Sequence, residues 1–450
     1  MLDIVTNQIR LPDGTTRRNF LRAGFLGLGG MSLGQLLQSR SEAGLKKKPK
    51  NTSIILLWQV GGPSHLETYD MKPNSPDGYR GPFGAIKTNV PGIEICDLLP
   101  MHAQRADRFS LIRSCTHKHA GHNEGHCMTL TGRPDWDEGT HLPIHPECGA
   151  VVNRLFGQCR GGVPVTVGMG AKHYGYVPGT TAGYWGAGYN GPVVDKGLPN
   201  ASPIVDGRRL EDRRKLLTSL DTVRRASDAT GKMDAMSSFN RQAFEIVTSD
   251  KVNVAFDLER EDKMTRERYG EGWGQQALLA RRLVEAGVSF VTVGVPGGKV
   301  IYNWDDHAVN GDLPTAMRER LPGYDQAVTA LIDDVYERGL DHQVMIVAMG
   351  EFGRTPQFRQ SVGNRSKKLQ WGRDHWPGAM SILISGGGKR MGQVIGSTDS
   401  HGAYPSERPL DPHDVLATFY DHLGVDPQHQ FVDNAGRPFP LTDGTPIAEL

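Results

Sequence analysis

The residues with the clearest potential for chemistry are Glu351 and His375, each placed beside an apolar stretch. Residues 344–349 are continuously apolar, as expected for a buried parallel strand, and Glu351 follows them directly. His375 precedes a second apolar run at 380–384. Because open α/β sheets bind their ligands at strand ends, we predict that Glu351 and His375 lie close together in a metal or anion site.

A second candidate group follows the strand predicted at residues 288–293. Asp305, Asp306 and His307 stand in one short segment after it. Carboxylate oxygens and imidazole nitrogens suit hard to borderline divalent cations. Residues of these types often lie solvated on a protein surface without a role, but the place of this segment after a strand favours a function. We therefore predict that all three are metal ligands together with Glu351 and His375.

The densest histidine cluster follows the strand predicted at residues 109–114. It comprises His117, His119, His122 and His126. Histidine is the commonest neutral metal ligand, and positions 122 and 126 share a face if the segment is helical. We predict metal binding for His119 and His126, catalysis for His122 and substrate binding for Asn123. The alternative is a polar, hydrogen-bonded loop.

The first predicted strand of the folded part, at residues 53–58, ends at a Gly-Gly turn followed by Ser64, His65 and Thr68. The hydroxyl of Ser64 or Thr68 is a candidate nucleophile, and His65 is a candidate metal ligand. Arg354 and Arg373 flank the Glu351 and His375 motifs, and we predict that they pair with an anionic group in bidentate fashion.

Composition narrows the class of protein. The chain has 450 residues, 38% of them hydrophobic, and a formal net charge of only +1. The net charge therefore gives no strong electrostatic field that would indicate binding to nucleic acid or to an anionic membrane. The five cysteines form no C-x-x-C pair, which argues against a zinc ribbon or a redox motif. A Cys148–Cys159 disulfide and buried reduced cysteines are equally open.

The N-terminus has the features of a twin-arginine export signal. Arg17 and Arg18 precede Asn-Phe-Leu, and residues 23–37 form a short, glycine-rich, weakly apolar run. A transmembrane helix needs about 20 apolar residues, so this run does not predict one. We predict a signal peptide at 1–43, a periplasmic or otherwise extracytoplasmic mature protein, and no integral membrane segment after cleavage.

The remaining chain, 44–450, is predicted to be one α/β domain. Residues 161–200 are rich in glycine and tyrosine and indicate a long surface loop, whereas 208–287 is charged and helical and ends with a helix at 275–286. A second amphipathic helix is predicted at 321–338, and Asp411 is predicted to cap the last one.

Several motifs carry a resemblance to a known family. They are Gly61-Gly62-Pro63-Ser64-His65, Glu351-Phe352-Gly353-Arg354-Thr355-Pro356, Gly372-Arg373-Asp374-His375-Trp376 and the twin-arginine leader. Together they resemble the bacterial "protein of unknown function 1501" family of the alkaline phosphatase and sulfatase superfamily. The resemblance implies a three-layer alkaline-phosphatase-like sandwich, with a mostly parallel central sheet and helices on both faces.

The resemblance also implies site positions and shows where this chain departs from the superfamily. His307 and His375 match the two histidines of one superfamily metal site, but the aspartate expected four residues before the first falls on Asn303. Phe352 stands where a histidine is usual, and His122 stands near the nucleophile position. This departure counts against a covalent phosphoryl- or sulfo-enzyme route at that position. The alternatives are a hydroxyl from Ser64 or Thr68, or water activated directly by a different metal site built from His65, His119, His122, Glu124 and His126.

From these observations we expect an exported metal-dependent hydrolase-like protein that acts on phosphate or sulfate esters of small molecules or glycans. Zinc is the first expectation for the metal, with calcium, manganese or magnesium as alternatives. The competing hypothesis is a non-catalytic extracytoplasmic binding or scaffold protein that retains the fold with a degraded metal site. The substrate and the oligomeric state do not follow from the sequence.

Overall fold

The central feature of the computed structural model is an eight-stranded mixed sheet. The structure describes residues 52–157, 159–160, 162–194, 249–433 and 437–450. The sheet order is β16 (Val394–Ile395), β4 (Phe109–Cys115), β15 (Met380–Gly386), β10 (Val344–Met349), β1 (Ser53–Gln59), β9 (Phe290–Val295), β7 (Thr166–Gly170) and β8 (Val193–Val194). β1 pairs in parallel with β10 and β9, while β15 runs antiparallel to both of its neighbours. The predicted α/β class with a mostly parallel sheet is confirmed.

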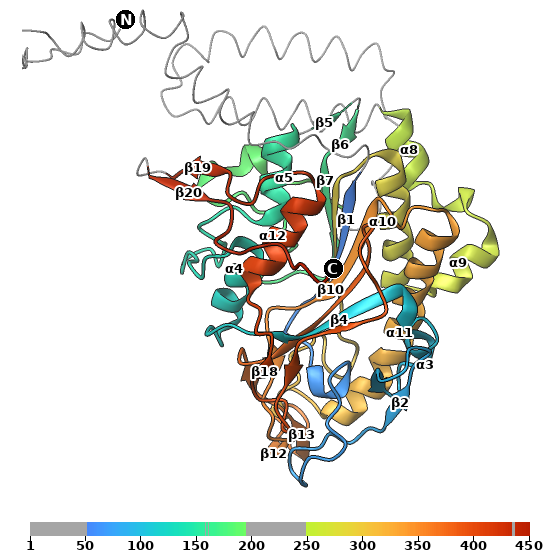
Figure 1. Ribbon diagram of the computed structural model, residues 1–450, viewed down its shortest axis with the longest axis vertical. Helices are drawn as coiled ribbons and strands as arrows, with labels where there is room; N and C mark the ends of the chain where they lie inside the picture. Colours follow the sequence, from blue (N-terminus) through green and yellow to red (C-terminus); the bar gives the residue numbers. More distant parts are fainter. Residues whose placement is uncertain (1–51, 158, 161, 195–248, 434–436) are drawn as a thin grey trace, which may run out of the picture.

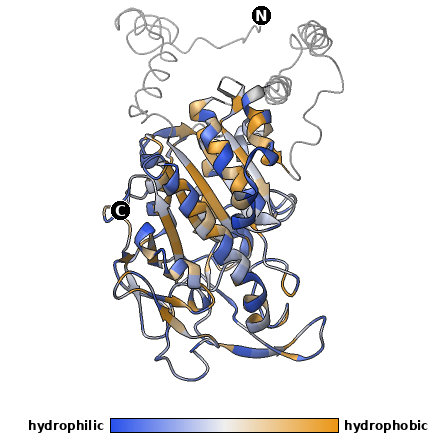
Figure 2. Ribbon diagram, turned by 90° about the vertical axis from the view of Figure 1, so that its right-hand side faces the viewer, coloured by the Kyte–Doolittle hydropathy of each residue, from blue (hydrophilic) through white to orange (hydrophobic). Residues whose placement is uncertain are grey.

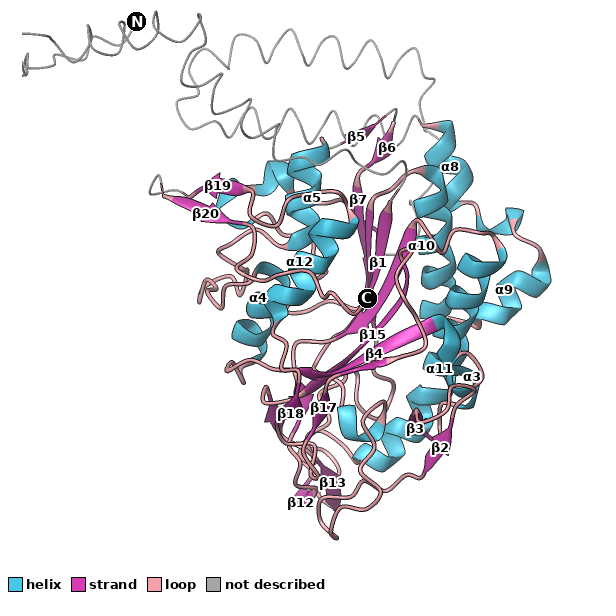
Figure 3. Ribbon diagram, viewed as in Figure 1, coloured by secondary structure: helices cyan, strands magenta, loops and turns pink. Residues whose placement is uncertain are grey.

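Helices cover both faces of this sheet and make three layers (Figures 1 and 3). One face of β1, with Ile55 and Leu57, shares a buried core with α10 (Trp273–Ala286) and α11 (Leu313–Glu337). The other face, with Leu56 and Trp58, shares a second core with helices α4 (His122–Thr131), α5 (Cys148–Phe156) and α12 (Pro412–His422). Because alternate strand residues point to opposite faces, an uninterrupted apolar strand such as β1 is buried on both sides. Figure 2 shows the apolar colour of the central strands.

The helix ends follow the capping signals in the sequence. α10 stops at Gly287, whose φ of 111° suits glycine, and Asp411 caps α12 in a capping box with Asp414. The predicted helix at 321–338 belongs to the longer α11, which begins at Leu313 and contains Pro322. Shorter helices are α3 (Pro100–Ala103), α8 (Asp250–Phe256) and α9 (Lys263–Tyr269). The predicted signal peptide and the first part of the predicted helical insert, to residue 248, lie outside the described residues.

The prediction of one long surface loop at 161–200 is wrong in part, because β7 lies within it as a strand of the central sheet. Its glycines permit close packing: a Cβ on Gly168 would lie 2.6 Å from Thr180. Glycine in a strand can mark close approach rather than a loop. The Cys148–Cys159 disulfide is not supported, since Cys148 is a free, buried cysteine at the start of α5.

Two-stranded ribbons complete the described part of the chain. They are β2 (Ala85–Lys87) with β3 (Glu94–Cys96), β5 (Cys159–Arg160) with β6 (Val163–Pro164), β11 (Gly353–Arg354) with β14 (His375–Trp376), β12 (Arg359–Val362) with β13 (Leu369–Gly372), β17 (Ser397–Thr398) with β18 (Pro405–Glu407), and β19 (Gln430–Val432) with β20 (Pro438–Pro440). None of the helices that the structure describes has the length and apolarity that a membrane crossing needs.

Candidate metal centre

The carboxyl ends of the parallel strands β1, β9 and β10 meet at one edge of the sheet and build the site. The loop after β9 supplies Asp305 and His307, and the residue pair after β10 supplies Glu351. The β11–β14 ribbon brings His375 beside them, and the first residue of α4 is His122. Five side chains from four distant segments thus converge, with Glu351 and His375 both among them.

Asp305 is the centre of this cluster. Its Oδ1 lies 3.1 Å from Nε2 of His307 and 3.1 Å from Nε2 of His375, and its Oδ2 lies 3.4 Å from Nε2 of His122. Potential ligand atoms of His122, Asp305 and His375 all lie within 4.8 Å of one another. Burial raises the pKa of Asp305, but its contacts with the three histidines and the charge of Arg354 outweigh burial and hold that pKa well below its usual range.

The contacts of His375 leave two acceptor atoms facing each other. Nδ1 of His375 lies 2.8 Å from the carbonyl oxygen of Ala120, which can only accept, so Nδ1 carries the proton. Burial lowers the pKa of His375 and outweighs the opposing effect of Asp305, which favours the neutral ring. The lone pair on Nε2 then faces Oδ1 of Asp305, which is also an acceptor. These two atoms could both be ligands of a divalent cation.

His307 also has an acceptor at Nδ1 and directs Nε2 at Asp305. Its Nδ1 lies 2.7 Å from Oδ1 of Asp374, while its Nε2 points to Asp305. A carboxylate on the far nitrogen of an imidazole is the usual support of a metal-ligating histidine. Asp374, which the motif contains but the sequence analysis did not assign, therefore belongs to the site.

Glu351 is fully buried, and only one of its two carboxylate oxygens has hydrogen-bond partners. Its Oε1 accepts from the backbone N–H of Gly61 at 2.9 Å and lies 2.8 Å from Nδ1 of His122. Its Oε2 is buried and has no hydrogen-bond partner. An isolated buried carboxylate oxygen is costly, so it indicates an additional positive group or proton. Burial lowers the pKa of His122, but its hydrogen bonds to Asp305 and Glu351 outweigh burial and raise that pKa to about 9.

Phe352 packs against the histidine rings. Its ring centroid lies 4.4 Å from that of His375 and 5.4 Å from that of His122. A Cβ on Gly62 would lie 2.5 Å from the Phe352 ring, and Gly62 also has a φ of +81°. The Gly-Gly turn after β1 is therefore required by close approach of the backbone to this ring. Sequence reasoning treated Phe352 only as a missing histidine.

The two candidate hydroxyl nucleophiles lie outside the cluster. Ser64 is fully buried and its hydroxyl donates to Glu67, while the buried Thr68 hydroxyl donates to the carbonyl of Ser64 at 2.7 Å. The ring of His65 lies 2.8 Å from the carbonyl of Gly402 through Nε2 and is also buried. These three side chains stabilise the turn around the 3₁₀ helix η1 (His65–Glu67) and do not join the metal centre.

The two arginines predicted to bind substrate are structural. Arg354 is fully buried, donates to the carbonyl of Gly62 at 2.8 Å and pairs with Asp305 at 2.8 Å. Arg373 is also buried and forks onto Glu67, with Nε 3.0 Å from both carboxylate oxygens. Neither guanidinium is placed to meet an external anion, because burial and internal carboxylates already fix both.

Asp306 is likewise not part of the centre. It is fully buried and forms an ion pair with Arg320 of α11. Burial raises its pKa despite that partner. Adjacent residues on a loop point in different directions, so Asp305 faces the histidines while Asp306 faces the protein interior. Asn303 accepts from the backbone N–H of Asp305 at 3.2 Å, and Asp305 takes the central place that the resemblance assigned to position 303.

The other members of the histidine cluster have separate roles. Nε2 of His126 lies 2.8 Å from Glu147, and the pair is completely buried. Asn123 contacts the rings of His141 and His173 at 3.1 and 3.2 Å. His119 is half-buried and donates its backbone N–H to His117. The structure therefore places His122 alone of the four predicted positions, 119, 122, 123 and 126, in the metal centre.

A family profile described as "Protein of unknown function (DUF1501)" matches residues 51–450. Ps i-CgsB is 13% identical, with a TM-score of 0.42, and the match covers 88% of this chain and 75% of that chain. PsFucS1 sulfatase from Pseudoalteromonas sp. is 12% identical, with a TM-score of 0.38 and coverage of 87% and 72%. Alkaline phosphatase from the Antarctic bacterium TAB5 is 12% identical, with a TM-score of 0.37 and coverage of 84% and 99%. No curated protein matches the chain.

Proposed function

Because the chain belongs to the DUF1501 family of proteins of unknown function, its activity has to be inferred from its own site, and we propose that it is a metal-dependent hydrolase of phosphate or sulfate esters. The observation that carries the proposal is the contact at 3.1 Å between Nε2 of His375 and Oδ1 of Asp305, two acceptors that a cation would join.

The donor set fits a divalent metal. His122, Asp305, His307 and His375 would hold it, and the unpartnered Oε2 of Glu351 is a further candidate ligand. Imidazole nitrogens combined with carboxylate oxygens suit zinc first, while calcium, manganese and magnesium favour oxygen-rich sets. A bound divalent ion would polarise an ester oxygen and lower the pKa of a water molecule towards ~7.

The protein's own residues prepare the site for an anionic ester. Asp305, Glu351 and Asp374 would repel a phosphate or sulfate group if they stood alone, so the proposal requires the cation. Asp374 and the carbonyl of Ala120 hold the histidine tautomers, and Arg354 offsets the charge of Asp305.

Water is the nucleophile in this proposal. The hydroxyls of Ser64 and Thr68 are buried and donate to protein acceptors. Water would form the new bond to phosphorus or sulfur, the ester bond would break, and the alcohol would leave with a proton. The alternative, a non-catalytic binding or scaffold protein with a degraded metal site, predicts no turnover whether or not metal is bound, so one experiment separates the two.

The experiment compares the exported wild-type protein with His375→Ala by elemental analysis and by hydrolysis of p-nitrophenyl phosphate and sulfate. His342→Ala is the control, since His342 is exposed and precedes β10 at the opposite end of that strand. We expect about one equivalent of a transition metal in wild type and the control, its loss in His375→Ala, and a parallel loss of hydrolysis. Metal-free wild-type protein would contradict the proposal, and metal without hydrolysis of any ester would favour the binding protein.

Export by the twin-arginine route is part of the same proposal. This part of the proposal rests on the twin arginines, Arg17 and Arg18. Changing both to lysine should leave the protein in the cytoplasm and unprocessed, as fractionation and N-terminal sequencing would show. Unchanged export of that variant would contradict this route.

A further inference from the structure

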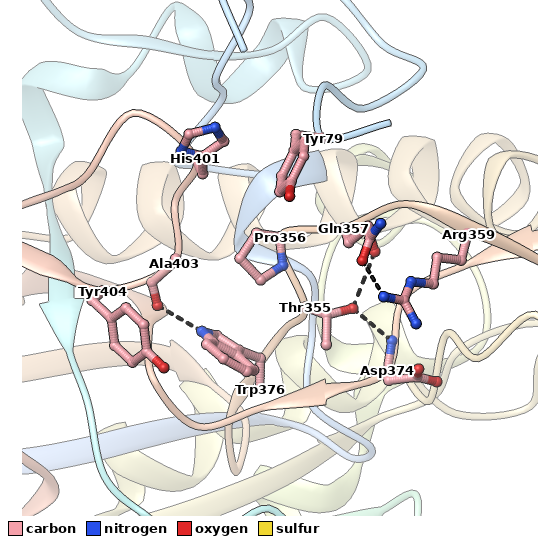
Figure 4. A pocket seen from close by; sticks show the side chains of 10 residues that line it. All are labelled: Tyr79, Thr355, Pro356, Gln357, Arg359, Asp374, Trp376, His401, Ala403 and Tyr404. Carbon is pink, nitrogen blue, oxygen red and sulfur yellow. Dashed lines mark hydrogen bonds between the residues drawn. The ribbon is translucent and has the colours of Figure 1, made fainter. Parts of the chain in front are cut away.

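A cavity of about 400 Å³ adjoins the metal centre and has no role in the chemistry described above (Figure 4). This volume lies within the range of about 300–1,000 Å³ that is usual for small-molecule sites. Its wall includes Tyr79, Thr355, Arg359, Asp374, Trp376 and Tyr404. In Figure 4 Trp376 and Tyr404 lie on one side of the cavity, and Arg359 and Asp374 lie on the other.

The aromatic side presents ring surface. Tyr404 is 54% exposed, and its ring centroid lies 5.3 Å from that of Trp376, with the ring planes inclined by 60°. The indole N–H of Trp376 already donates to the carbonyl of Ala403 at 2.6 Å. A ligand therefore need only supply apolar surface here. Because the two ring planes are inclined, they do not form the parallel pair that would stack on both faces of a planar nucleobase. They can instead pack against the C–H groups of a non-planar sugar ring.

The polar side offers both hydrogen-bond acceptors and donors. The Asp374 side chain is 67% exposed, and Arg359 is also exposed and bonded to Gln357. Hydroxyl groups can donate to a carboxylate and accept from a guanidinium. An anion would meet repulsion from Asp374 as well as attraction to Arg359, so the cavity favours a neutral, polyhydroxylated ligand.

Asp374 connects this cavity to the metal centre. Its Oδ1 lies 2.7 Å from Nδ1 of His307, and Nε2 of His307 lies 3.1 Å from Asp305. His375 and Trp376 are neighbours on β14, so one short strand contributes to both sites. A ring held against Trp376 and Asp374 would therefore have its substituents beside the cluster.

We propose that this cavity binds neutral carbohydrate, with Trp376 and Tyr404 as the aromatic platform and Asp374 as acceptor for a sugar hydroxyl. In its full form the inference rests on the proposed function, since the carbohydrate would be the alcohol part of the ester that the metal centre cleaves. Binding of the sugar itself needs neither metal nor turnover.

The test measures binding of neutral oligosaccharides built from glucose, galactose, mannose, fucose or N-acetylglucosamine to the exported protein, by calorimetry and tryptophan fluorescence. We expect at least one of them to bind, and Tyr404→Ala and Trp376→Ala each to weaken binding about tenfold. Trp371→Ala is the matched control, because this exposed tryptophan of β13 stacks on Phe358 outside the cavity wall. It should bind as wild type does.

The outcomes separate this inference from the proposed hydrolase. Binding should persist in His375→Ala and after chelation, so a protein that binds sugar without cleaving esters would refute the hydrolase and leave the cavity assignment standing. The assignment is overturned if no oligosaccharide binds wild type, or if Tyr404→Ala and Trp371→Ala behave alike. If circular dichroism shows that Trp376→Ala is unfolded, the binding affinity of Tyr404→Ala, whose side chain is exposed, tests the assignment.

Discussion

Nε2 of His375 lies 3.1 Å from Oδ1 of Asp305, while the other ring nitrogen of the same histidine already contacts the carbonyl of Ala120. The two residues are 70 positions apart, on a strand-end loop and on a ribbon that folds back over it. A neutral imidazole cannot donate through both nitrogens, so Nε2 of His375 and Oδ1 of Asp305 face each other as two acceptors, which is the arrangement that the proposed metal site requires.

Asp374 should support metal binding through His307. Asp374→Ala removes the acceptor 2.7 Å from Nδ1 of that ring and frees its orientation. Loss of such an outer partner typically weakens metal affinity by about 10–100-fold, measured by competition with a chromophoric chelator. Asp77→Ala, at a carboxylate that is 95% exposed and paired with Arg80, serves as the control. Equal affinities in both variants would contradict the role of Asp374.

Gly62 should be intolerant of a side chain because of Phe352. In Gly62→Ala the new Cβ would lie 2.5 Å from the aromatic ring, at a φ of +81°. Gly78→Ala is a matched control, since φ is +86° and nothing lies within 4 Å. The control should lose only the backbone term of about 1–2 kcal/mol in unfolding free energy. Gly62→Ala should lose more and should also bind metal less tightly, as denaturant unfolding and chelator competition would show.

The buried Glu67–Arg373 pair should be essential for stability rather than for substrate binding. Both side chains are fully buried, and Glu67→Gln would leave the guanidinium without its counter-charge. Breaking a buried pair from one side costs about 3–5 kcal/mol of unfolding free energy. The exposed Arg408–Glu449 pair offers the comparison, and Glu449→Gln should change the unfolding free energy by less than about 1 kcal/mol. A small effect at Glu67 would show that the pair is not a structural clamp.

His422 should make the protein less stable at acidic pH. Burial lowers its pKa to about 4, and Nε2 contacts the backbone carbonyls of Ser53 and Gln343 at 3.1 and 3.2 Å. Between pH 6.5 and about 4 the unfolded chain binds a proton that the folded protein does not, so unfolding free energy falls as pH falls. The full effect is about 3 kcal/mol, and it is absent above pH 6.5.

Denaturant titrations across this pH range test the role of His422. His422→Gln keeps a hydrogen-bond donor but cannot titrate, so its stability should depend less steeply on pH than that of wild type. Identical slopes for the two proteins would contradict the assignment. The comparison is made between slopes because other buried histidines, such as His117 with a pKa lowered to about 4 by burial, contribute to both proteins.

Much of the fold follows from local sequence. The apolar runs of β1 and β10, the Gly287 cap of α10 and the Asp411 cap of α12 are properties of adjacent residues, and the structure has each of them. The glycines of β7 look like turn signals in the sequence and favour a loop there. Their packing against Thr180 and Gly294 depends on segments that sequence reasoning could not place.

The sequence by itself places Asp305 and Glu351 after apolar strands, at the carboxyl edge that parallel strands share. His375 precedes its apolar strand and reaches the same edge only because β15 runs antiparallel to β10. Only the tertiary structure decided which polar residues face that edge. Arg354 and Arg373 have the right chemistry for an anion, but buried carboxylates already hold them. His126 is one helical turn from His122, yet it is paired with Glu147. Burial and partners distant in sequence decide whether a polar side chain is a ligand or a structural support, and neither is encoded in local spacing.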